Sequence, residues 1–152
     1  MDIGRRPSGP ASFFDDVDRN YVVAQLEGRM DAPVDLTVVA RRSSPLLLAP
    51  AEGAEEAARA ERLAQELAAL EPRIRVTVTG EGAGDVPVFS VASRASAGTV
   101  RFVGVPRVNL FRALLEAVRR TSTGEHGLAE GWAEALASLP RPVSARVFAT
   151  PT

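Results

Sequence analysis

The sequence predicts an α/β fold in which a mixed four-stranded sheet is flanked by helices and preceded by an extra N-terminal helix. Two segments of alternating apolar and polar residues, 34–40 and 74–79, enclose an Ala/Glu-rich stretch with helical spacing. Two further apolar segments, 87–92 and 99–105, are joined by a short Ser/Arg/Gly link. Strand, helix and strand in this order predict a right-handed parallel crossover, and the short link predicts an antiparallel hairpin.

A short leading helix precedes the first strand. Asp16 or Asp18 can cap its N-terminus, and the helix is expected to end near Pro33. Its apolar stripe consists of Val22, Val23, Leu26 and Met30. In the segment 34–40 the alternation then becomes fully apolar, which is typical of a central strand.

The longest predicted helix, 52–71, connects the two parallel strands, and Pro72 ends it. Its apolar residues have helical spacing, at Ala60, Leu63, Ala64 and Leu67. Two more helical stripes follow the hairpin and Pro106. They comprise Phe111, Leu114, Leu115 and Val118, and then Leu128, Trp132, Ala135, Leu136 and Leu139.

The order βαβ followed by ββα is the thioredoxin arrangement, a mixed sheet with helices on both faces. Residues 1–12 lack apolar periodicity and are expected to form a disordered tail, so that the domain spans 13–139. Residues 140–152 are predicted to form a linker followed by a further strand. We expect that strand, 143–149, to stay out of the first sheet's core and to be frayed, docked on an edge or paired between chains.

Composition excludes several classes of function. The 18 basic and 19 acidic residues give a net charge of -1, so no field of one sign favours nucleic acid or an anionic membrane. No apolar run approaches the roughly 20 residues of a membrane helix, and Met1–Asp16 lacks a signal-peptide layout, so we expect a cytoplasmic protein. Every Lys/Arg position is Arg, which excludes lysine chemistry. The absence of cysteine excludes disulfides, thiolate catalysis and zinc–thiolate sites.

Two stretches carry a resemblance to a known family. Thr99–Pro106 followed by Phe111, together with 142–152, resembles the glutaredoxin-like protein disulfide oxidoreductases and the N-terminal domain of flavin-dependent alkyl hydroperoxide reductase subunits. The resemblance covers about residues 17 to 152. Members of these families carry two fused thioredoxin folds. The resemblance implies that 143–149 is the first strand of the second fold, where a Cys-Pro-Tyr-Cys motif follows a Thr-Pro-Thr sequence.

The resemblance also implies where a binding site lies. In the first fold of these families the active-site cysteines are often lost, and the corresponding loop here is Arg41–Pro50, with Ser43 and Ser44 near the place of a thiol. Val86–Pro87 occupies the place of the cis-proline whose neighbouring backbone pairs with an extended substrate peptide. The alternative for Pro87 is a trans proline at the start of a strand.

Other candidate sites have a simpler structural explanation. Ser43 and Ser44 are not accompanied by a readable triad, because the sole histidine, His126, lies in a turn-rich segment far along the chain. Glu125, His126 and Glu130 fit a solvated helix start better than a metal site. The glycines of 80–84 precede a strand and not a helix, which argues against phosphate binding. We expect no catalytic residue, metal or cofactor.

The sequence departs from the family pattern at one motif. The family's Gly-His-Glu-Phe appears here as Val108–Phe111, so contacts made by that His and Glu do not carry over.

Two functions from different classes remain. The first is a non-catalytic structural and substrate-docking half of a thiol-disulfide oxidoreductase, whose partners are a second thioredoxin-like unit and a redox protein. The alternative is a free-standing, redox-inactive adaptor that binds an extended peptide or a protein. Association of identical chains is left open, and a non-redox enzyme lacks any supporting constellation of residues. The coding sequence that follows Thr152 distinguishes the first two.

Overall fold

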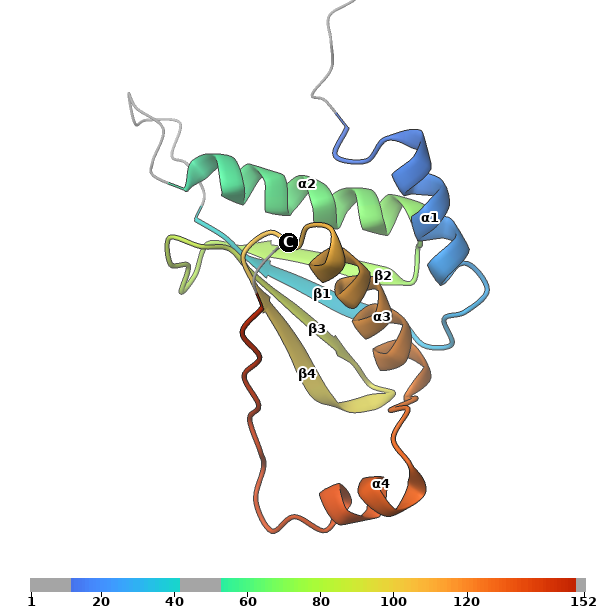
Figure 1. Cartoon of the computed structure of the whole chain (residues 1–152). Helices are drawn as coiled ribbons and strands as arrows, with labels where there is room; N and C mark the ends of the chain where they lie inside the picture. Colours follow the sequence, from blue (N-terminus) through green and yellow to red (C-terminus); the bar gives the residue numbers. More distant parts are fainter. Residues whose placement is uncertain (1–11, 42–52, 150–152) are drawn as a thin grey trace, which may run out of the picture.

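One mixed sheet organises the chain, and its four strands lie in the order β2-β1-β3-β4 (Figure 1). β1 (Val34–Val39) is parallel to β2 (Ile74–Thr79) and antiparallel to β3 (Val88–Ser93). β3 in turn pairs antiparallel with β4 (Ser96–Val103). The predicted mixed sheet, its parallel pair and its antiparallel hairpin are all confirmed.

Four helices complete the part of the chain that the computed structural model describes, residues 12–41 and 53–149. They are α1 (Asp16–Leu26), α2 (Ala54–Leu70), α3 (Asn109–Thr123) and α4 (Glu130–Ala137). Each corresponds to a predicted helix. The predicted tail, 1–12, lies outside the described residues except for Ser12.

Two boundaries differ most from the sequence-based prediction, and the others shift by at most two residues. α1 ends before Gly28, whose φ of 67° leaves the helical region, and not near Pro33. β4 begins at Ser96, earlier than the predicted residue 99, because the hairpin is tighter than its composition suggested. At its turn the Ser93 hydroxyl accepts a hydrogen bond of 3.2 Å from the Ala95 N–H, and the pairing shifts register between Val91 and Ser93.

The two helices that pack on the sheet, α2 and α3, lie on one face of it and not on both faces as expected, and α1 packs on these two helices. In β1 the alternate residues Val34, Leu36 and Val38 are buried, whereas Asp35 is exposed and Thr37 is half-buried. Both α2 and α3 contact β1, so both lie on its buried side. The difference arises because β2 connects to β3 through a loop, with no helix to cover the second face.

The core between sheet and helices is a single apolar cluster. Its largest fully buried side chains come from every element except β2, β4 and α4: Val22 and Leu26, Leu36 and Val38, Leu63 and Leu67, Phe89 and Val91, and Leu114 and Val118. Truncating one such side chain to alanine costs about 2–5 kcal/mol, so this cluster holds the fold together.

The extra helix α1 is attached to α2 by polar contacts and to α3 by an aromatic contact. Its N-cap is Asp15, whose carboxylate accepts a 2.8 Å hydrogen bond from the Asp18 N–H; the predicted caps, Asp16 and Asp18, lie inside the first turn. Just before the helix, Phe14 is buried, and its ring centroid lies 5.3 Å from that of Phe111 on α3. The Glu66 carboxylate of α2 accepts from the N–H of Phe14 at 3.2 Å.

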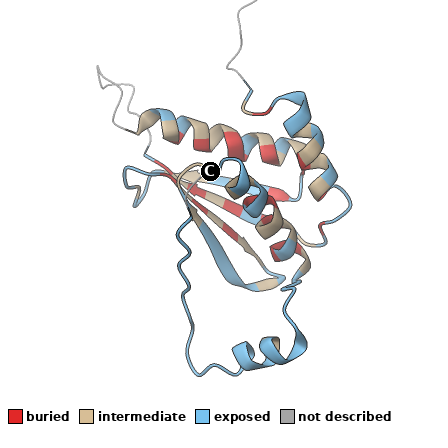
Figure 2. Cartoon of the chain, in the orientation of Figure 1, coloured by how far each residue is buried: buried red, intermediate tan, exposed pale blue. Residues whose placement is uncertain are grey.

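The last part of the described chain leaves the domain surface. α4 forms as predicted, but it has no buried residue, and its apolar residues Trp132 and Leu136 are 69% and 52% exposed (Figure 2). Residues 143–149 are extended and wholly exposed and belong to no strand. No helix among the described residues is long and apolar enough to cross a membrane.

Candidate functional site

Three segments meet at the end of the sheet where β1 and β2 finish and β3 begins. Arg41 follows β1, Gly53 caps α2, and Asp85 lies in the loop before β3. The Arg41 guanidinium lies 3.1 Å from the Asp85 carboxylate, and both side chains are exposed. A Cβ on Gly53 would come within 2.6 Å of the Asp85 carbonyl oxygen, and its φ is 81°, so only glycine permits this approach.

Val86–Pro87 lies beside this junction, at the start of β3. Pro87 is buried, and Val86 is 50% exposed. The Pro87 carbonyl oxygen accepts a hydrogen bond of 2.8 Å from the Gly104 N–H, which ties the loop to the end of β4. Among the described residues, Val86 takes part in no backbone hydrogen bond of the turns, loops and caps.

The cis-proline prediction is wrong. The described residues contain no cis peptide bond, so Pro87 is a trans proline at a strand start, which was the alternative. A trans X–Pro bond is favoured by about 0.5–1 kcal/mol unless tertiary contacts reverse it. Here the contact between Pro87 and Gly104 is made with the trans bond.

A shallow recess opens on the α2 side of the same end. It has a volume of about 300 Å³ and is lined by small or aliphatic residues and one charge of each sign: Ala40, Arg41, Ala54, Ala57, Ala58, Glu61 and Val78. Its lining exposes both polar and apolar atoms, so it can contact the backbone and a small side chain of an extended polypeptide. The predicted loop residues Ser43 and Ser44 lie outside the described residues, so they are not placed relative to this recess.

The start of α3 is joined to α2 at this end by charged side chains. Arg107 lies 2.8 Å from the Glu56 carboxylate, which also binds Arg59 at 3.0 Å. Val108, the N-cap of α3, has a φ of 47° and is the one non-glycine residue with positive φ among those described. Sequence reasoning missed these ion pairs, because charged residues on exposed surfaces give no signal of their partners.

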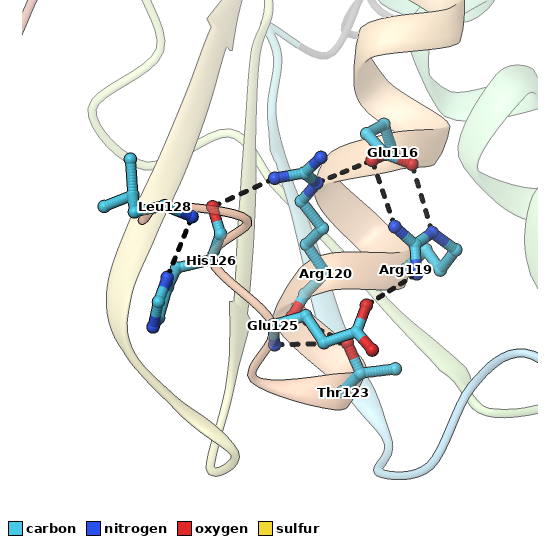
Figure 3. Close-up of polar contacts among 7 residues, drawn as sticks. All are labelled: Glu116, Arg119, Arg120, Thr123, Glu125, His126 and Leu128. Atoms are coloured by element: carbon cyan, nitrogen blue, oxygen red, sulfur yellow. Dashed lines mark hydrogen bonds and ion pairs between the residues drawn. The ribbon is translucent and has the colours of Figure 1, made fainter. Parts of the chain in front are cut away.

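A second polar cluster lies at the other end of α3 (Figure 3). Glu116 accepts hydrogen bonds from Arg119 and Arg120, and these bonds lower its pKa from 4.5 to about 2. Arg119 also binds Glu125 at 3.1 Å, and Arg120 donates to the His126 carbonyl oxygen at 3.0 Å. The cluster thus fastens the turn after α3.

His126 makes a hydrogen bond within this turn. Its Nδ1 accepts a hydrogen bond of 3.1 Å from the Leu128 N–H (Figure 3). Among the residues that the structure describes, no three His, Asp or Glu side chains are grouped so as to hold a metal ion. The cluster therefore acts as a structural link between α3 and α4.

Comparison with known proteins identifies the fold. No protein-family model and no curated protein matches the chain. Two solved structures of the alkylhydroperoxide reductase AhpF from Enterococcus faecalis resemble it at 15% identity: a cysteine-to-alanine mutant, with a TM-score of 0.62, and the NTD_N/C domain, with a TM-score of 0.63. Each comparison covers 84% of this chain but only 62% of the solved chain, less than two thirds of its length. The chain therefore has a thioredoxin-like fold, similar to that of the AhpF N-terminal domain.

Proposed function

We propose that this chain is a non-catalytic, substrate-docking thioredoxin-fold unit of a thiol-disulfide oxidoreductase. The observation that carries the proposal is the combination of this fold with a complete lack of cysteine. A unit without a thiol cannot exchange disulfides, because a thiolate is the attacking group. Such a unit can instead bind a substrate polypeptide while a second, cysteine-bearing unit reacts with that polypeptide.

The docking surface is the end of the sheet around Val86. The backbone groups of Val86 can pair with an extended polypeptide in the manner of an added strand, and the recess beside Ala40 and Val78 can take a small side chain. Backbone pairing is independent of sequence, which suits a unit that receives many unfolded substrates.

A thiol assay tests the non-catalytic part of the proposal. The purified chain is expected to show no insulin reduction and no dithiol oxidation at any pH, because neither reaction can proceed without a thiol or disulfide of its own. Measurable turnover with a dithiol donor would contradict it.

A binding experiment tests the docking part. An unfolded polypeptide whose thiols have been alkylated is titrated into the ¹⁵N-labelled chain, so that docking occurs without chemistry. We expect shifts of the amide resonances of Ala40, Val86 and Gly104. Val86→Asp should weaken binding because it places a charge beside the pairing backbone, whereas Val17→Asp, on the exposed side of α1, should not. Equal binding by the two variants would exclude this surface.

The alternative, a redox-inactive adaptor, shares the docking surface and differs in its context. A Cys-Pro-x-Cys motif encoded directly after Thr152 supports the oxidoreductase half. A coding sequence without any such motif favours the adaptor.

A further inference from the structure

Within the part of the chain that the structure describes, neither the outer edge of the sheet nor the segment 143–149 has a strand partner. β4 is hydrogen-bonded to β3 on one side only, and its regular part is Val100–Val103. Apart from Arg101, β4 carries no charge or proline of the kind that protects sheet edges. The segment 143–149 is extended, and its Val147 and Phe148 are 90% and 92% exposed.

The chain cannot easily place this segment on its own β4. Viewed from the helix face with β1 pointing up, a right-handed β1–α2–β2 crossover puts β2 on the right, so β4 lies at the far left and also points up. After β4 the chain continues through α3 on that same face. Figure 1 shows that 143–149 then runs in roughly the same direction as β4. Adding it beside β4 would make a left-handed crossover, which occurs in only about 2% of such connections.

We propose that segment 143–149 pairs with β4 of a second copy of this chain. Pairing between copies is not bound by the handedness of a single chain's connection. Each copy offers both the free edge and the free segment, so two copies related by a two-fold axis satisfy each other reciprocally. No other molecule is required.

The charges and apolar side chains of 143–149 and β4 determine which face of the sheet each side chain of the added strand would occupy. Like charges directly opposite each other destabilise a sheet, so Arg146 and Arg101 belong on opposite faces. This arrangement places Phe148 on the face of Val100 and Phe102. It places Val143 and Val147 on the other face, with Val103, which is 73% exposed. Exposed apolar side chains are thereby covered on both faces.

Sedimentation equilibrium from about 1 µM to about 1 mM tests the association. The intact chain should form a dimer. Val147→Pro removes the N–H that a strand ladder needs and should weaken the dimer at least about tenfold, whereas Val147→Ile keeps both the N–H and the branched side chain and should not. Because Val147 is exposed, neither change affects the core. A monomer throughout this range, or equal dimerisation by the two variants, would overturn the proposal.

Cross-linking between copies locates the edge. The chain has no cysteine, so single introduced thiols report without background. Copies carrying Arg101→Cys, isotopically labelled, are mixed with copies carrying Ala145→Cys, which the pairing places on the same face. A mixed disulfide is expected. Arg75→Cys on β2, the other edge strand, is the matched control and should not link to Ala145→Cys; preferential linking to position 75 would refute the assignment to β4.

This inference goes beyond the proposed function and fails separately from it. A chain that stays monomeric can still bind an unfolded polypeptide at Val86, and a dimer can form without such binding.

Discussion

At the scale of single residues, Val108 is the clearest departure from favourable backbone geometry. Its φ of 47° and ψ of -112° are close to those of the first central residue of a type II′ turn, which glycine dominates. The Leu110 N–H donates a hydrogen bond of 3.0 Å to the Arg107 carbonyl oxygen across this turn. A β-branched residue is strained there.

Replacing Val108 by glycine is therefore expected to stabilise the protein. Relief of the positive φ should raise the free energy of unfolding by about 1 kcal/mol, and little burial is lost because Val108 is 67% exposed. Urea denaturation measures the change. Val17→Gly, at an exposed and normally helical position of α1, is the control and should lower the free energy of unfolding by about 0.5–1 kcal/mol. Destabilisation by both variants would show that Val108 is not strained.

Glu66 makes the attachment of α1 dependent on pH. Burial raises the pKa of this carboxyl, but hydrogen bonds from the Phe13 N–H, the Ser12 hydroxyl and the Phe14 N–H, with the charge of Arg19, outweigh burial and lower the pKa below 4.5. A lowered folded-state pKa contributes stability that is present above the unfolded pKa and is lost as the pH falls through the folded pKa.

Glu66→Gln is expected to cost about 1 kcal/mol of unfolding free energy at pH 7, because the amide keeps one acceptor oxygen but loses the charge. The difference from the parent chain should shrink as the pH falls below 4.5, where the parent's carboxyl becomes protonated. Denaturation at pH 3, 5 and 7 measures it, with the exposed Glu81→Gln as the control. A difference that is the same at all three values would show that the ionised form is not favoured by folding.

At the scale of elements, α4 shows that an amphipathic sequence can form a helix without being buried. Its sequence has helical spacing, but in this structure the stripe faces solvent. Arg119 and Arg120 of α3 hydrogen-bond to Glu125 and His126 in the turn that leads to α4. These bonds hold the turn, and α4 itself makes none of them.

Removing residues 130–152 should therefore leave the domain intact. We expect the unfolding free energy of the monomer to change by less than about 0.5 kcal/mol, because no buried side chain is lost. Leu114→Ala, in the core, is the comparison and should cost about 2–5 kcal/mol. Thermal or urea unfolding at low protein concentration measures both. A loss by truncation as large as that of Leu114→Ala would mean that α4 packs on the domain.

Elements and interactions differ in how well the sequence predicts them. The strands and helices could be predicted from periodicity. Leu36 alternates with polar neighbours, as in a strand, and Leu63 and Leu67 are spaced about one helical turn apart. The exposure of α4 and the uncovered sheet face could not be predicted, because periodicity shows that one side of an element is apolar but not what that side faces. The ion pair of Arg41 with Asp85 and the trans bond of Pro87 depend on tertiary contacts between segments far apart in sequence.

At the scale of the whole molecule, the uncovered sheet face has a composition of its own. Aligned across the strands by their pairing register, Thr77, Thr37, Ser90 and Arg101 form a polar row. Beside it, Thr79, Val39, Val88 and Val103 form a more apolar row at the end where Val86 lies. The face thus becomes more apolar toward the end of the sheet where Val86 lies. Its apolar row is next to the proposed docking surface, and its polar row is farther away.

The pairing of β1 with β3 also has a consequence for folding kinetics. Residues 34–79 close a parallel crossover and residues 88–123 contain a local hairpin, and the two halves of the sheet meet only where β1 pairs with β3. Contacts that join distant segments require loop closure before they stabilise anything, so we expect this seam to set the rate-limiting step. Val91→Ala, whose side chain lies in the seam, should mainly slow folding, whereas Leu67→Ala, at the far end of α2, should mainly speed unfolding. Stopped-flow chevrons in urea separate the two effects, and a reversed assignment would place the nucleus within the crossover.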